Sequence, residues 1–152
     1  MIKINDTYIS GIAALNIPCP EDTWGLREFF FLNSEEDLKN DLAGSGESCF
    51  VNTNDIFQNE GLYECSAIFL ELGHDLSKEG ETFCANHYRA FCDLLVSHIL
   101  DGVDSYLDPD DYFTTEAHLT ILDSWVERCE IHLGEKYQPS FDQWRQTIQN
   151  GL

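Results

Sequence analysis

The stretch EGETFCANHYRAFCDLLVSHILD, residues 79–101, carries the strongest structural signal in the sequence. Its apolar residues recur at intervals of three and four, which is the spacing that places side chains on one face of an α-helix. The members of this stripe are Cys84, Tyr88, Phe91, Leu95 and Ile99. Gly102 follows directly, and glycine commonly ends a helix. The spacing therefore predicts a helix from about Glu79 to Asp101 with one buried face.

Two further stretches in the second half predict helices. From Thr114 to Leu133 an apolar stripe recurs at helical spacing and Gly134 ends it, the members being Leu119, Leu122, Val126, Cys129 and Leu133. Ser140 and Gln143 match a capping box, in which the hydroxyl and the amide each satisfy a free backbone group. They predict the start of a final helix, whose apolar residues are Phe141, Trp144 and Ile148.

The first half of the chain predicts short strands. Tyr8 to Ile17 alternates loosely and stops at Pro18, and residues 27–32 hold a short apolar run. Ser34 predicts the start of a short helix that ends at Gly44, and residues 49–51 are a further candidate strand. Leu62 to Leu72 is apolar on both faces, which predicts a strand at the centre of a sheet.

This order of elements predicts one α+β domain over residues 1–152. A small, mainly antiparallel N-terminal sheet would precede a C-terminal helical half of about three helices. Hydrophobic residues make up 43% of the chain and aromatic residues 12%, which is too apolar for a disordered acidic tail. We expect a buried core that includes Phe29, Phe31, Phe69, Phe91, Leu95, Leu122, Val126 and Trp144.

The six cysteines indicate a cytoplasmic protein with reduced thiols. They form no C-x-x-C pair. The N-terminus lacks the basic and apolar regions of a signal peptide, and no apolar run approaches the ~20 residues of a membrane span. We therefore expect no membrane association.

The charge of the chain is its most unusual compositional feature. It has 28 Asp and Glu residues against 8 Lys and Arg residues, a net charge of −20. Two windows, residues 40–77 and 90–127, contain no Lys or Arg. The densest part is the segment Asp101–Asp111, here called the connector, which holds five acids. Such charge opposes compaction and favours solubility and the steering of basic partners.

No catalytic, cofactor or metal motif stands out. Cys84, His87 and Asp101 resemble a nucleophile, base and orienting acid in composition, but on one helix Cys84 and Asp101 would lie about 25 Å apart. The loop around Asp108 lacks the glycine and the terminal glutamate of an EF-hand. Phosphate-binding loops, dinucleotide fingerprints and hydrolase elbows are absent from the sequence. Arg89 is expected to pair with Asp93.

Two stretches carry a resemblance. Residues 8–18, which read YISGIAALNIP, and residues 85–95, which read ANHYRAFCDLL, together resemble a group of small, poorly characterised bacterial proteins of mobile-element character. The likeness covers about twenty residues and implies no activity. It implies a role in conflict between phage or mobile elements and their host, a setting that includes acidic anti-CRISPR proteins and acidic antitoxins.

We therefore expect a non-enzymatic inhibitor that occludes a basic nucleic-acid-binding surface of another protein or effector complex, as an anti-CRISPR protein would. The alternatives are an antitoxin or immunity protein that caps a basic toxin, then an unrecognised enzyme. A further explanation of the charge is acid that only keeps the protein soluble, as in many acidic cytosolic proteins. Direct nucleic-acid binding is disfavoured because both partners would be polyanions. The first candidate contacts are Asp101, Asp104, Asp108, Asp110 and Asp111, and the second are Asp55, Glu60 and Glu64.

Overall fold

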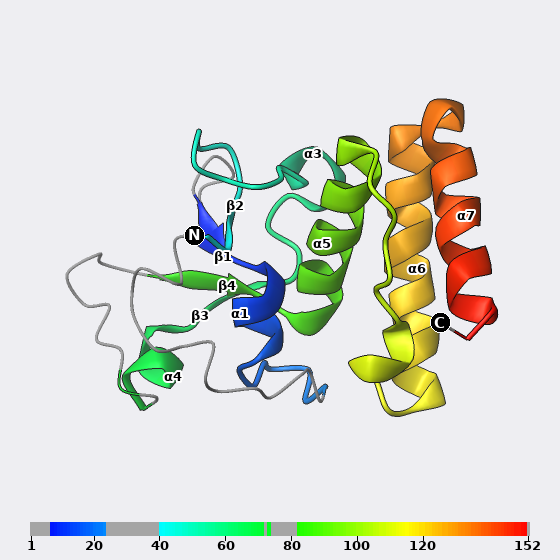
Figure 1. Ribbon diagram of the computed structural model, residues 1–152. Helices are drawn as coiled ribbons and strands as arrows, with labels where there is room; N and C mark the ends of the chain where they lie inside the picture. The colour runs from blue at the N-terminus through cyan, green and yellow to red at the C-terminus, as the bar shows by residue number, and fades with distance from the viewer. Residues whose placement is uncertain (1–6, 24–39, 72, 74–81, 152) are drawn as a thin grey trace.

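The computed structural model of the protein describes residues 7–23, 40–71, 73 and 82–151. Figure 1 shows helix α5 between two groups of elements, with the sheet and α1 on one side and the pair α6 and α7 on the other. The elements are β1 (Tyr8–Ile9), α1 (Gly11–Leu15), β2 (Leu42–Ala43), α3 (Asn54–Phe57), β3 (Leu62–Glu64), α4 (Ser66–Glu71), β4 (Phe83–Ala85), α5 (His87–Asp101), η3 (Pro109–Asp111), α6 (Glu116–Leu133), η4 (Glu135–Tyr137) and α7 (Gln138–Gln149).

The sheet has four short strands in the order β2-β1-β4-β3. β1 pairs antiparallel with β2 and parallel with β4, and β3 pairs antiparallel with β4. The sheet is therefore mixed, with antiparallel pairing at both edges. The predicted α+β fold, with a small sheet in the N-terminal half and helices mostly in the C-terminal half, is confirmed.

The stretch 79–101 holds a strand as well as a helix. The predicted helix start near Glu79 is wrong, because Phe83–Ala85 forms the inner strand β4 and α5 begins at His87. Asn86 separates the two, since its side chain accepts a hydrogen bond from the backbone N–H of Arg89 and so caps the helix. The predicted end is confirmed, as Gly102 takes the left-handed conformation at φ 70°.

The other helices of the second half follow the sequence with one correction. α6 begins after Thr115, whose hydroxyl accepts from the N–H of His118, and it ends before Gly134 as predicted. α7 begins earlier than the capping box predicted. It starts at Gln138, so Ser140 lies inside its first turn, beside Pro139. Proline fits there because the first turn of a helix has no partner for its backbone N–H groups.

Several strand predictions in the first half are wrong. Only Tyr8–Ile9 of the predicted strand 8–17 is a strand, because Gly11, at φ 59°, turns the chain into α1. The segment 62–72 divides into β3 and α4, and β3 lies at an edge of the sheet. Leu42, expected on a helix, lies in β2. Residues 49–51 form no strand, although the N–H of Phe50 donates to the carbonyl of Leu42.

Two further predicted elements cannot be compared with the structure. The predicted strand at 27–32 and the helix start at Ser34 fall outside the described residues.

The core forms where α5 meets the sheet, α1 and α6. Six of the predicted core residues are buried, namely Phe69, Phe91, Leu95, Leu122, Val126 and Trp144, and Phe29 and Phe31 lie outside the described residues. All six cysteines are free, five of them buried. In the described part of the chain, no helix has both the length and the apolar composition that crossing a bilayer requires.

A buried polar network joins α5 to the sheet and to α3. Arg89 and Asp93 are both fully buried. They meet through the hydroxyl groups of Tyr8 and Thr53, which donate to the Asp93 carboxylate at 2.7 and 2.6 Å, while the guanidinium of Arg89 donates to both hydroxyl oxygens. Ser10 adds a third donor to Asp93 at 2.7 Å. The expected link between Arg89 and Asp93 thus runs through shared hydroxyl groups.

Candidate functional site

The connector crosses the helical half in an extended path. It leaves α5 at Gly102, where the N–H of Val103 donates to the carbonyl of His98 and closes the helix end. Figure 1 shows it returning alongside α5 toward the single turn η3, with α6 and α7 beyond it. The buried rings of Tyr112 and Phe113 follow η3 and fix the far end of the connector in the core.

Two inward-pointing residues hold the middle of the connector. The hydroxyl of Ser105, which is buried, lies 2.9 Å from Nδ1 of His98 on α5. The carbonyl of Leu107 accepts a hydrogen bond of 2.8 Å from Nε1 of Trp144 on α7. Side chains alternate along an extended chain, so Tyr106 points outward between these two attachments. Asp104, directly before Ser105, is also exposed. The connector is therefore a pinned segment that displays alternate side chains to solvent.

The first group of predicted acids lies on this segment. Asp101, Asp104, Asp110 and Asp111 are exposed and Asp108 is half-buried. Asp108 also caps η3, because its Oδ1 accepts from the N–H of Asp110 at 3.0 Å. Partial burial raises the pKa of Asp111, and the charges of Asp108 and Asp110 raise it further. The structure thus brings these last three carboxylates close enough to repel one another.

Exposed apolar side chains lie among these acids, a feature that the sequence reasoning missed. Leu100 is 45% exposed, Val103 54% and Tyr106 61%. They are half of the six large exposed hydrophobic residues in the described part of the chain. The sequence holds no signal for the exposure of Tyr106, because that exposure follows from the burial of Ser105 and Leu107, which the structure shows. Exposed aromatic and aliphatic groups that cluster are typical of interaction sites.

The second group of predicted acids has partners within the protein. Glu60 forms a 2.6 Å ion pair with Arg128 on α6. The carboxylate of Glu64 accepts from the N–H and the hydroxyl of Ser66 at the start of α4, and the hydroxyl bond is the main cause that lowers the pKa of Glu64. Asp55 is exposed in the first turn of α3. Glu60 and Glu64 therefore hold local structure together.

Buried Arg89 positions the loop that carries Glu60. Its guanidinium donates to the carbonyls of Gln58 and Glu60, the latter at 2.8 Å. Gly61 follows at φ 82°, and a Cβ there would lie 2.9 Å from the ring of Trp125. The loop is thus fixed by a buried cation from inside and by Arg128 from outside.

The basic residues of the described chain are engaged internally. Arg89 is buried in the polar network, Arg128 pairs with Glu60, and Arg145 pairs with Glu130 through two hydrogen bonds. Lys136 lies 5.4 Å from the ring centre of Tyr137. The side chains of Arg128 and Arg145 are 39% and 42% exposed but paired with carboxylates, and Lys136 is exposed. These few cations leave the connector acids in a negative field.

Asp101 lies apart from Cys84 and His87 in the structure, so these three residues do not form a triad. His87 is buried, with Nδ1 against the hydroxyl of Thr23 and Nε2 against the carbonyl of Ile17. Burial raises the pKa of the Cys84 thiol well above its usual value, and Asp101 lies at the opposite end of α5. A search of the described residues finds no cluster of three or more metal-binding side chains.

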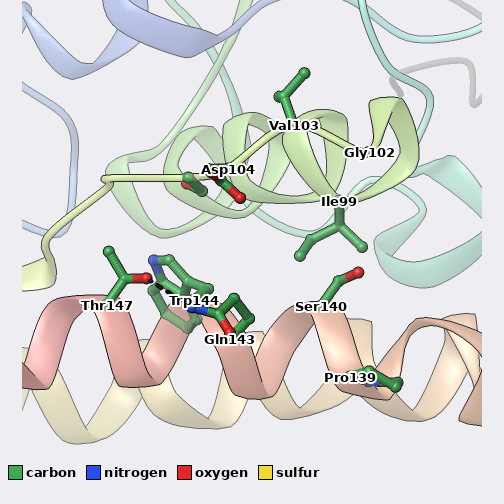
Figure 2. Close-up of a pocket in the computed structure, with 10 residues that line it drawn as sticks. Ile99, Gly102, Val103, Asp104, Pro139, Ser140, Gln143, Trp144 and Thr147 are labelled. Atoms are coloured by element: carbon green, nitrogen blue, oxygen red, sulfur yellow. Dashed lines mark hydrogen bonds between the residues drawn. The ribbon is translucent and has the colours of Figure 1, made fainter.

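A pocket of about 190 Å³ adjoins the connector. It lies between the end of α5, the start of the connector and the first turns of α7, and its lining includes Ile99, Val103, Asp104, Gln143 and Trp144. Figure 2 shows Asp104 on the connector across the pocket from Gln143 and Thr147 on α7. One of the predicted contact residues, Asp104, therefore also lines a hollow beside the exposed apolar side chains.

Comparison of the chain with protein-family models, with curated proteins and with solved structures finds no match.

Proposed function

We propose that this protein is a non-enzymatic inhibitor that binds a basic nucleic-acid-binding surface of another protein and occludes it. The observation that carries the proposal is the surface formed by the connector and the end of α5, where the exposed side chains of Leu100, Val103 and Tyr106 lie among carboxylates. Acidic side chains that served only to keep the protein soluble would not require exposed apolar side chains beside them. An interface needs both kinds, because apolar contacts supply affinity and charge supplies orientation.

The charge suits a partner that normally holds phosphates. A DNA duplex presents one negative charge per ~1.7 Å of axis, and proteins that bind it neutralise its phosphates with Lys and Arg side chains. Three carboxylates within the short segment Asp108–Asp111 can occupy the same cations. The field of the whole chain, at net −20, would draw such a partner in from a distance.

An antitoxin or immunity protein that caps a basic toxin is the second proposal. The specific observation in its favour is the exposed Tyr106, at 61%, because an aromatic anchor fits a protein pocket and has no counterpart in a phosphate backbone. Both proposals place the protein in the cytoplasm, and the six free thiols support that setting.

The test is a competition experiment with a matched charge control. The full chain is immobilised, partners are captured from host lysate at low salt, and the protein released by high salt is identified. Nucleic acid is then titrated against the purified complex. Displacement by nucleic acid is the expected result, and simultaneous binding with unchanged affinities would refute occlusion.

Two quadruple variants separate the site from the net charge. In the first, Asp104, Asp108, Asp110 and Asp111 are changed to Asn. In the second, four exposed acids elsewhere are changed to their amides, namely Glu47, Asp123, Glu127 and Glu135. Both variants lose four charges. We expect the first to weaken partner binding far more than the second, and equal effects would show that net charge decides.

A further inference from the structure

We infer that the pocket between the connector and α7 is an arginine-binding subsite, which receives the side chain of one arginine from the partner. The inference rests on the proposed function and names the chemistry at one point of that surface. The pocket is smaller than the ~300–1,000 Å³ typical of sites for cofactors and drug-sized ligands, at about 190 Å³. Its size fits a single inserted side chain, as in the central pockets of protein interfaces.

The lining is divided into an apolar part and a polar part. Ile99 and the indole of Trp144 form the apolar part, while the side chain of Val103, at the rim, points away from α7 in Figure 2. Figure 2 shows Ile99 pointing from α5 toward α7. Arginine has a long aliphatic stem that packs against surfaces of this kind while its head stays polar.

The polar part of the lining offers hydrogen-bond acceptors. Asp104 supplies a carboxylate, and among the described residues it takes part in no ion pair. Ser140 and Thr147 supply hydroxyl oxygens. The amide nitrogen of Gln143 donates to the hydroxyl of Thr147 at 3.4 Å, which leaves the amide carbonyl as an acceptor. No Lys or Arg lines this pocket.

These acceptors favour arginine over lysine. A guanidinium has five N–H donors in a planar fork, so it can bond a carboxylate in a bidentate manner and still reach neighbouring acceptors. An ammonium group is a compact charge with three donors and would leave part of the lining unpaired. Arginine is also a residue with which nucleic-acid-binding proteins hold phosphate. The pocket would thus engage a residue that the partner uses for its own ligand.

The subsite can be tested on the full chain without a known partner. The probe is the capped peptide acetyl-Gly-Arg-Gly-amide, titrated at low salt into isotope-labelled protein and followed by NMR. The indole N–H of Trp144 is the reporter, because it donates to Leu107 beside the pocket. Matched peptides carry citrulline, which has the same shape without charge, or lysine.

We expect saturable shifts of the Trp144 indole and the Gln143 amide with the arginine peptide, at millimolar concentration. Asp104→Asn should weaken this binding about tenfold, the scale of one charge-assisted hydrogen bond. Asp110→Asn is the control on the same connector outside the pocket, and it should change the affinity less than twofold. Ser140→Met, which fills the pocket from α7, should abolish binding, with thermal melts confirming the fold of each variant.

Three results would overturn the inference: equal shifts with the citrulline peptide, equal affinity for the lysine peptide, or unchanged affinity in Asp104→Asn. The partner assay keeps the two proposals apart. If nucleic acid displaces the captured partner while Asp104→Asn and Ser140→Met leave the partner's affinity unchanged, the occlusion proposal stands and the subsite falls. If the arginine peptide binds as expected but nucleic acid does not displace the partner, the subsite stands and occlusion falls.

Discussion

Trp144→Phe should loosen the connector and lower the stability of the whole domain. The indole is buried, and its Nε1 donates to the carbonyl of Leu107 at 2.8 Å. Phenylalanine keeps a ring in the core next to Phe91 but removes this donor. The carbonyl of Leu107 would then lose its bond to α7, and the middle of the connector would keep only its attachment through Ser105.

The magnitude follows from two terms. A buried carbonyl left without a partner costs about 1–3 kcal/mol. The smaller ring removes apolar area that contributes about 1 kcal/mol at ~25 cal/mol per Å². The free energy of unfolding should therefore fall by about 2–4 kcal/mol, a sizeable part of the ~5–15 kcal/mol that stabilises a typical domain. Each kcal/mol corresponds to about 2–4 °C in Tm for a chain of this size.

Denaturant melts measure the global loss, and native-state hydrogen exchange measures the local one. Trp125→Phe is the matched control, because Trp125 is equally buried and packs against Phe57 at a ring distance of 4.7 Å, away from the connector. Both variants should destabilise the domain. Only Trp144→Phe should reduce the protection of the Val103 and Leu107 amides by more than the global loss. Equal protection in the two variants would refute the idea that Trp144 pins the connector.

Three further predictions concern the core, the pH dependence and the thiols. Phe91→Ala should cost about 3–5 kcal/mol because the ring is fully buried, and a loss below ~1 kcal/mol in denaturant melts would contradict its central place. Burial lowers the pKa of His98 below its usual 6.5 despite the nearby Asp101. As the pH falls, the imidazole is therefore protonated in the unfolded chain before it is protonated in the folded protein. The contribution of neutral His98 to the free energy of unfolding should be fully present above pH 6.5 and be lost progressively as the pH drops below it. His98→Asn, which can still bond Ser105, should flatten that part of the profile, and an unchanged slope would exclude His98 as its source. Alkylation of the denatured, unreduced protein should modify all six thiols by mass spectrometry, and a recovered disulfide would contradict the cytoplasmic proposal.

The sequence predicted best those elements whose signals are local. The helix α6 has a hydroxyl cap at Thr115, a regular stripe and a terminal glycine, all within its own residues. Strand β4 has no such signal, because its three residues become a strand through pairing with Ile9 on one side and Tyr63 on the other. The prediction of one central strand over Leu62–Leu72 was wrong because its apolar pattern is also ambiguous. Apolar residues on both faces fit a buried strand as well as a strand followed by the short helix α4.

The candidate site also has features that the sequence predicts and features that it does not. The acids of the connector could be located by counting charges. The exposure of Tyr106 could not, because a burial pattern with Ser105 inside and a tyrosine outside runs against hydropathy. The pocket could not be predicted. It depends on the bond between Trp144 and Leu107, which are far apart in the chain and meet only because α7 packs beside the connector.

The repulsion within the connector gives the proposed interaction a source of free energy. Asp108, Asp110 and Asp111 are held together by η3 and by the buried rings that follow it. Burial raises the pKa of Asp111, and the charges of Asp108 and Asp110 raise it further. A segment free to spread would separate these charges, so the fold keeps them close at a cost to its own stability. A basic partner would remove that cost on binding, because each carboxylate would gain a cation without any rearrangement of the connector. Charge that is merely scattered would give fast association and little else, whereas charge held rigid beside exposed apolar groups and a pocket can also select the partner.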